Sequence, residues 1–194
     1  MTNETLLQAI QSAFSATRYP GTDEVVYDNS GKHLECIEVR EAFKDNVWTA
    51  LPADLLDEQQ TSLFFMSHRG FAYYLPAFMT YVVADFDRGA GLADNLIAKL
   101  TLPIDMDVAI MAQAIKSTKL DQQMPEVDFL ATLQNQLEGR NQDVHNFIAR
   151  AALLSFEQGW VVQQFLTFLA TKHADEYPNN EPTTAIDRYW FQFG

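Results

Sequence analysis

The side chains best suited to chemistry lie close together near the start of the chain. His33, Glu35 and Glu38 fall within six residues, and Asp28 lies just upstream. On a helix that begins near Leu34, Glu35 and Glu38 share a face, as two carboxylate ligands of a divalent cation would. The spacing matches neither His-Glu-x-x-His nor Glu-x-x-His, the patterns in which helix geometry makes ligands converge. An acidic first turn is also typical of a solvated helix start, so we expect no metal site and treat His33, Glu35 and Glu38 only as weak candidates.

The other reactive side chains form no recognisable catalytic set. The sequence nominates no Ser/His/Asp or Cys/His combination, and Gly89-Ala90-Gly91 lacks the following Lys of a phosphate-binding loop. The single cysteine, Cys36, shares a helical pattern with Val39 and Phe43, which is typical of a small buried hydrophobe. We therefore expect no cofactor. Whether the protein is an enzyme stays open at this point, and we favour one that is not.

Aromatic residues are concentrated between residues 64 and 81. At helical spacing Phe71, Tyr74 and Phe78 share one face, and Tyr73 lies off it. Core packing explains most of this group; the alternative is a pocket wall or a partner surface, in which we include Tyr73. A second aromatic group, in residues 189–193, must either dock on the body of the protein or form an interface.

Composition and charge exclude several classes of protein. The 194 residues are 47% apolar and 12% aromatic, which is typical of a globular chain, and one cysteine cannot support a disulfide framework. A net charge of −13 argues against nucleic-acid binding, because such a protein neutralises phosphates with Lys and Arg. No apolar run is long enough to span a membrane, and the first ten residues do not resemble an export signal. We therefore expect a cytoplasmic protein that binds neither nucleic acid nor membrane.

The elements that must position these residues are almost all helices. Apolar residues recur at helical spacing along nearly the whole chain, and no segment alternates convincingly, so we predict an all-α fold with few or no short strands. Ser67 is expected to cap a central helix over residues 71–85, which Pro76 should kink or break. Ser155 and Gln158 match a capping box at the start of another long helix. Further helices are expected after a cap at Thr2 or Asn3, over residues 34–43, and from Pro182 to near Trp190.

The chain is predicted to form a single domain over residues 1–194, since no Ser/Gly-rich linker divides it. We interpret residues 87–91 as a loop, and residues 92–100 as a helix with a short strand over 96–102 as the alternative. Residues 105–145 have weaker apolar stripes, interrupted by Pro125 and Gly139, and we expect them to form two helices in a lobe that packs against the body of the protein rather than completing it.

Several short motifs appear in a familiar order. They are Tyr19-Pro20-Gly21, the stretch from Ser30 to Glu41 followed by Trp48 and Leu51-Pro52, Phe71-x-Tyr73-Tyr74-Leu75-Pro76-Ala77-Phe78, Leu154-Ser155-x-x-Gln158 followed by Val162-x-x-Phe165-Leu166-x-Phe168-Leu169, and Ala185-Ile186-x-x-Tyr189-Trp190. In this order the chain resembles a family of small bacterial proteins classed as a domain of unknown function, over roughly residues 5–103 and 147–190. The resemblance implies a shared fold and a bacterial cytosolic setting, and it supplies no catalytic residues. Relative to shorter members of that family, residues 105–145 resemble an inserted helical pair.

Two classes of function fit an acidic, helical chain. The first, which we favour, is a binding protein that recognises a basic protein partner, as bacterial immunity proteins do when they cap toxic nucleases. The second is an enzyme that acts on a small molecule or depends on a metal and uses acids of residues 28–41. For either class, the candidate binding surface or pocket consists of Asp28, His33, Glu35, Glu38, Glu41 and Tyr73. The oligomeric state stays open.

Overall fold

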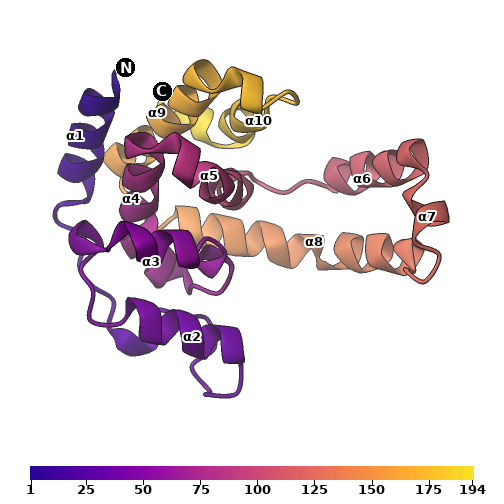
Figure 1. The fold of residues 1–194 in the computed structure, drawn as a ribbon, viewed down its shortest axis with the longest axis horizontal. Helices are drawn as coiled ribbons and strands as arrows, with labels where there is room; N and C mark the ends of the chain where they lie inside the picture. The colour runs from indigo at the N-terminus through magenta and orange to yellow at the C-terminus, as the bar shows by residue number, and fades with distance from the viewer. The chain divides into compact units, whose positions relative to one another are not determined.

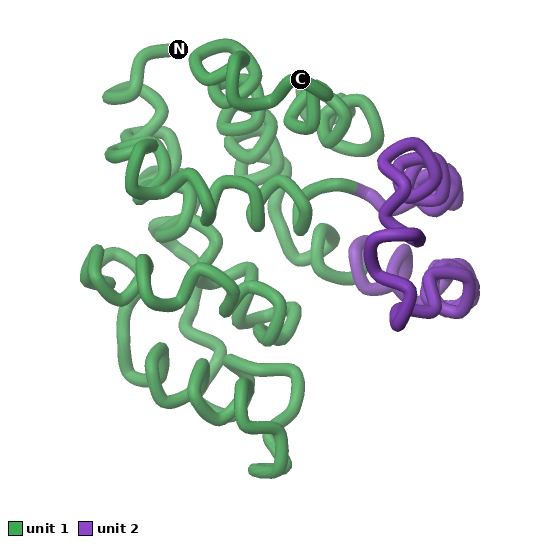
Figure 2. Tube along the Cα trace, turned by 45° about the vertical axis from the view of Figure 1, so that its right-hand side comes forward, with its two compact units in different colours: residues 1–101, 149–194 green, residues 102–148 purple.

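The structure, a computed structural model, describes residues 1–194 and is built from helices (Figure 1). It has ten α-helices, five short 3-10 helices and no sheet, and its extended pairing is limited to an isolated bridge between Val26 and Met66. The prediction of an all-α fold is confirmed. The chain separates into two compact units, one of residues 1–101 and 149–194 and the other of residues 102–148 (Figure 2).

The first unit contains most of the helices. Its α-helices are α1 (Asn3–Phe14), α2 (Leu34–Phe43), α3 (Ala53–Glu58), α4 (His68–Ala84), α5 (Phe86–Leu100), α9 (Phe156–Lys172) and α10 (Glu181–Arg188). Its 3-10 helices are η1 (Thr22–Glu24), η2 (Trp48–Ala50), η3 (Ser62–Phe64), η4 (Ala174–Glu176) and η5 (Trp190–Phe193).

Helix α4 forms the centre of the first unit. Thirteen of its seventeen residues are buried, and it packs against α1 and α5. Helix α1 in turn packs against α9, which also contacts α10 and η5. Phe14 of α1, Phe78 of α4 and Phe165 of α9 are fully buried. Burial of these wide apolar faces, rather than intrinsic helix propensity, is the main source of stability for helices of this kind.

Three of the predicted helix starts are confirmed by their side-chain caps. The Thr2 hydroxyl caps α1, and the Ser67 hydroxyl accepts a hydrogen bond from the Gly70 N–H at 2.9 Å at the start of α4. Ser155 and Gln158 form the predicted capping box of α9: the Ser155 hydroxyl accepts the Gln158 N–H at 3.2 Å, and the Gln158 side-chain oxygen accepts the Ser155 N–H at 2.9 Å. Each cap satisfies backbone donors that a helix start would otherwise leave free.

Two segments that were expected to interrupt helices, Pro76 and residues 87–91, lie within continuous helices in the structure. Helix α4 continues through Pro76 as one element, because its residues on all sides are buried and outweigh a cost of about 3 kcal/mol for a proline inside a helix. The loop predicted over residues 87–91 is wrong, since these residues belong to α5, which Asp85 caps. A Cβ atom on Gly89 would lie 3.2 Å from the Val82 Cα, so the glycine permits close packing of α5 on α4. The strand alternative for residues 96–102 is also wrong, because α5 extends to Leu100.

The C-terminal aromatic group is partly docked. Trp190 is buried, and its Nε1–H donates to the Leu100 carbonyl oxygen at 2.6 Å. The Phe193 ring lies against the backbone of Gly159 in α9, whereas Phe191 is exposed. Docking of a buried Trp with its N–H satisfied ties this end of the chain to two helices of the first unit.

The second unit contains α6 (Asp105–Thr118), α7 (Leu120–Gln123) and most of α8 (Phe129–Ala151), whose last residues belong to the first unit. Helix α8 is continuous and passes through Gly139. Lys119, with a positive φ of 54°, joins α6 to α7. Within residues 102–148 only Val108 and Phe147 are buried. None of the helices in either unit combines the length and the apolar character needed to cross a bilayer.

Candidate functional site

Helix α2 carries three of the candidate residues on its exposed side. Its buried positions are Cys36, Val39 and Phe43, and they alternate with the exposed Glu35, Glu38 and Glu41 at three-residue spacing. Side chains three residues apart are neighbours on a helix surface, so the three carboxylates form a row. The apolar side of α2 thus determines which way the acidic side faces.

A tight turn before α2 brings Tyr27 back to His33. The Asp28 carboxylate accepts the Ser30 N–H at 2.8 Å, and Gly31 has a positive φ of 75°, which glycine adopts without strain. Hydrogen bonds from Ser30, with a smaller effect of nearby His33, lower the pKa of Asp28. The turn therefore contains an ionised Asp28 at neutral pH.

Tyr27, His33 and Glu35 form a hydroxyl–imidazole–carboxylate chain. The Tyr27 hydroxyl lies 2.9 Å from His33 Nε2, and His33 Nδ1 lies 3.2 Å from Glu35 Oε2. The second contact has ion-pair distance but not the alignment of a hydrogen bond. The imidazole also packs edge-on against the Tyr27 ring and lies beside Phe65, with ring centroids 5.5 and 5.8 Å away.

Tyr27 is the protonated end of this chain. Desolvation of its hydroxyl, with smaller effects of the neighbouring Cys36, Asp28 and Glu35, raises the pKa of Tyr27 above its ordinary value. The phenol is therefore protonated at neutral pH. It donates to His33 Nε2 when that nitrogen carries no proton and accepts from Nε2–H when it does, so the imidazole tautomer sets the direction of this hydrogen bond.

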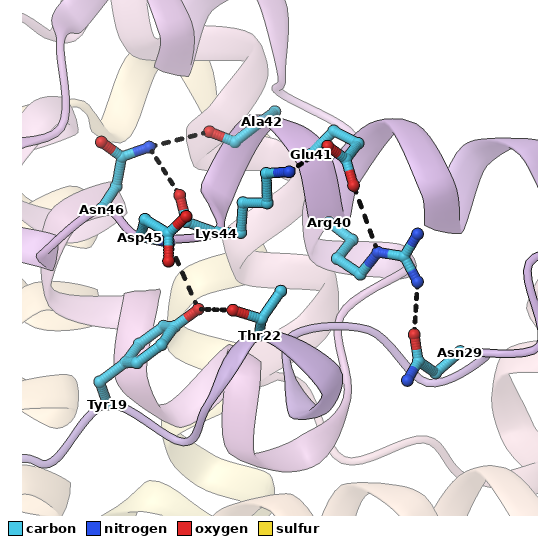
Figure 3. A network of polar contacts seen from close by, with 9 residues as sticks. All are labelled: Tyr19, Thr22, Asn29, Arg40, Glu41, Ala42, Lys44, Asp45 and Asn46. Atoms are coloured by element: carbon cyan, nitrogen blue, oxygen red, sulfur yellow. Dashed lines mark hydrogen bonds and ion pairs between the residues drawn. The ribbon is translucent and has the colours of Figure 1, made fainter.

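The end of α2 is held by a polar network, drawn in Figure 3. Glu41 pairs with Lys44, and its other oxygen lies 3.5 Å from Arg40 Nε; the hydrogen bond with Lys44 and the two positive charges lower the pKa of Glu41. Arg40 also donates to the Asn29 side chain, which links α2 to the turn before it. Glu38, between these pairs, is exposed and takes part in no ion pair.

The residues that follow α2 are anchored to the core. The Tyr19 hydroxyl accepts the Asp45 N–H at 3.4 Å (Figure 3), and Asp45 has a positive φ of 62°. The Tyr74 hydroxyl, buried on α4, donates to the carbonyl oxygens of Phe43 and Asn46. These bonds satisfy carbonyls at the C-terminal end of α2 and hold the helix against α4.

An open cleft of about 360 Å³ lies beside Tyr27. Its walls come from three separated stretches of the first unit: Asp23, Glu24, Val26, Tyr27, Ser67, His68, Arg69, Ala149 and Leu153. Arg69 Nη1 donates to both carboxylate oxygens of Glu24, at 3.0 and 2.7 Å. The other acidic residue of the cleft, Asp23, takes part in no ion pair. Backbone bonds from the Tyr27 N–H to the Phe65 oxygen and from the Ser67 N–H to the Val25 oxygen hold two of these stretches together.

The structure brings together only part of the predicted set. Asp28, His33 and Glu35 are neighbours, and Glu38 and Glu41 continue the row along α2. Tyr73 is separate: it is buried, and its ring packs against Tyr19 and Tyr74. Its place on α4, where nearly every position is buried, explains why an off-face tyrosine still points into the core.

His33, Glu35 and Glu38 do not converge as metal ligands. The structure contains no group of three or more His, Cys, Asp or Glu side chains arranged to hold a metal ion. Sequence reasoning missed Tyr27, Asp23 and Arg69. The signal for Tyr27 was available, because the Asn29-Ser30-Gly31 turn returns the chain and places Tyr27 opposite His33. The cleft had no such local signal.

Comparison with known proteins gives a family but no activity. A family model described as a family of unknown function (DUF6714) matches residues 2–107, more than half of the chain. No curated protein and no solved structure matches the chain. The matched residues include α1, α2, α4 and the cleft residues up to Arg69. The chain therefore belongs to DUF6714, a family of unknown function.

Proposed function

We propose that the protein is a non-enzymatic binding protein that recognises a basic protein partner through residues 27–45, which we call the recognition segment. The observation that carries this proposal is Glu38, an exposed carboxylate without an ion pair, in a row with Glu35 and Glu41. A cationic surface would complement this row of carboxylates. The net charge of −13 adds a long-range attraction for a cationic partner.

Exposed apolar side chains beside the acids support the same proposal. Tyr27 is 56% exposed and Leu34 is 70% exposed, at the start of the recognition segment. A tyrosine and a leucine next to charged groups supply contact area that a partner would desolvate, and tyrosine is enriched among the residues that dominate binding energy. The contact with His33 holds the Tyr27 ring in one orientation, which lowers the entropy cost of binding.

The cellular setting is part of this proposal. A cytoplasmic bacterial protein of the immunity type, which caps a basic toxin, would have the acidic charge, the single buried cysteine and the recognition segment described above.

The experiment begins with a pull-down from the native host and measures association of the captured partner by stopped flow. Replacing Glu38 and Glu41 by Gln should slow association roughly three- to tenfold at low salt, with little change in dissociation, because rim charges act mainly on the encounter rate. The matched control replaces Asp121 and Glu126 of the second unit by Asn and Gln. It removes the same amount of charge from residues that are distant in sequence from the recognition segment. Equal slowing in both variants would show only an effect of net charge and would contradict the proposal.

One observation favours an enzyme as the second candidate. The Tyr27 hydroxyl lines the cleft and contacts the His33 imidazole, which lies at ion-pair distance from Glu35, and such a set could transfer a proton to a small molecule. Tyr27→Phe separates the two functions, since it keeps the ring for partner binding and removes the proton. Calorimetry that detects a stoichiometric divalent metal, lost on changing His33 or Glu35, would favour the metal-dependent enzyme of the sequence analysis over the binding protein.

A further inference from the structure

Three carboxylates of the first unit lie around Tyr177. Asp94 is on α5, Glu176 ends η4, and Glu181 begins α10, which packs against α5. The Asn179 side-chain amide donates to Glu181 Oε1 at 3.0 Å and so ties this carboxylate to the turn that follows Tyr177. Burial and the charges of the three carboxylates raise the pKa of the Tyr177 phenol. We call Asp94, Glu176, Tyr177 and Glu181 the Tyr177 cluster.

The Tyr177 hydroxyl is buried and has no hydrogen-bond partner in the protein. The residue is 6% exposed, and its ring packs edge-on against Phe86 of α5, with ring centroids 6.5 Å apart. Glu181 Oε2 is also buried without a partner. Buried polar atoms normally have one, because desolvation without a hydrogen bond is costly. Both oxygens therefore lie where a group that donates hydrogen bonds would be stabilised.

The negative charge of the Tyr177 cluster is not balanced by an ion pair. None of its three carboxylates takes part in one, and burial together with repulsion from Glu181 and Glu176 raises the pKa of Asp94. His173 is affected by Glu176, but desolvation lowers its pKa, so it is neutral at pH 7 and supplies no counter-charge. Asp94 and Glu176 are exposed, so a ligand can reach the cluster from solvent.

We propose that the Tyr177 cluster binds an organic cation with several N–H donors, of which a guanidinium group is the best match. Its N–H groups donate to the Asp94 and Glu181 carboxylates and to the Tyr177 oxygen, and its charge offsets theirs. Hydrogen bonds between a cation and carboxylates are the stronger kind, so the buried Glu181 oxygen gains most from such a ligand. The cluster shares no residue with the recognition segment, and it is therefore a second cation-binding site.

The Tyr177 cluster fits an organic cation better than a metal ion. No three His, Cys, Asp or Glu side chains in the structure are arranged to hold a metal ion. Divalent cations take carboxylate, carbonyl and water oxygens, whereas the Tyr177 phenol, with its raised pKa, stays protonated at neutral pH. A guanidinium group can bridge acceptors that are further apart than metal ligands, because its five N–H donors form a planar fork.

The first test titrates the full chain with propylguanidinium and follows the backbone amide NMR signals of the Tyr177 cluster. Tetramethylammonium, which has the same charge but no N–H donor, should bind roughly tenfold more weakly. N-acetylarginine amide separates two sources of the cation: binding as tight as that of propylguanidinium indicates an arginine of a protein, and much weaker binding indicates a free small molecule. No binding of propylguanidinium at millimolar concentration, equal binding of tetramethylammonium, or tighter binding of Mg²⁺ at the same ionic strength would overturn the proposal.

The second test changes the cluster. Asp94→Asn should weaken propylguanidinium binding roughly tenfold and Tyr177→Phe roughly threefold, because the first removes a charged acceptor and the second a neutral one. Asp175→Asn is the matched control, since it removes the same charge from an exposed residue outside the cluster. Asp94→Asn also removes a repelled charge, so thermal unfolding should show no loss of stability that would explain weaker binding. Equal weakening by Asp94→Asn and Asp175→Asn would show only an effect of net charge and would refute the proposed site.

Discussion

Gly70 is the point at which the recognition segment is joined to the core, and its replacement by Ala tests that connection. A Cβ atom at Gly70 would lie 2.1 Å from the Val25 carbonyl oxygen and 2.8 Å from its carbon, both of them backbone atoms. Val25 must therefore move, which breaks the hydrogen bond from the Ser67 N–H to its oxygen and the one from the Ser67 hydroxyl to the neighbouring Glu24 carbonyl. The movement would carry Tyr27, two residues further on, away from His33.

The expected loss of stability is about 3 kcal/mol. Overpacking typically costs about 1–3 kcal/mol, and the two hydrogen bonds contribute about 0.5–1.5 kcal/mol each. Replacement of a helical glycine by alanine returns up to about 1 kcal/mol. Gly91→Ala is the matched control, because Gly91 is exposed on α5 and the atoms near its added Cβ belong to the Gln60 side chain, which can move away.

The assay is urea unfolding followed by the fluorescence of Trp48, Trp160 and Trp190, all in the first unit. Gly70→Ala should lower the free energy of unfolding, and Gly91→Ala should leave it unchanged or raise it slightly. If both variants change the free energy of unfolding by the same amount, helix propensity alone explains the change, and the close approach of Val25 to α4 does not affect stability. Association with the captured partner should follow the same order, with Gly70→Ala slower than Gly91→Ala.

Three further predictions follow from other contacts. The hydrogen bond from Tyr81, with the nearby Arg88, lowers the pKa of Asp57 in the folded protein. Ionised Asp57 therefore stabilises the fold fully above about pH 4, the pKa of Asp in the unfolded chain, and this stabilisation is lost as the pH falls through the lower pKa of the folded state. Asp57→Asn should flatten the acid side of a stability-versus-pH curve measured by urea unfolding. Trp190→Phe leaves the Leu100 carbonyl without its indole donor and should cost about 1–3 kcal/mol by the same unfolding assay, whereas an unchanged stability would mean that water replaces the bond. Replacing residues 105–145 by a short Gly/Ser linker should give a folded but less stable protein by circular dichroism and thermal unfolding, and complete loss of soluble protein would contradict our proposal that this lobe is an insertion.

Part of this protein is determined by signals that act within a few residues. The caps at Thr2, Ser67 and Ser155 could be predicted because each side chain bonds a backbone N–H three residues further on. The row of Glu35, Glu38 and Glu41 was equally accessible, since three-residue spacing on a helix is a local property. The all-α class follows from the same periodicity repeated along the chain.

Only the tertiary structure decided where the helices meet, and at which positions their contacts outweigh the local sequence preference. Asp87 to Gly91 reads as a loop by composition, but Gly89 is helical because α5 approaches α4 at that point. Tyr73 could not be separated from a pocket residue by pattern, since burial of α4 on every side is a property of its neighbours. The cleft is built from residues near 25, 68 and 151, and no local signal encodes their meeting. Such contacts depend on the packing of distant segments, whose energy appears only when the whole core forms.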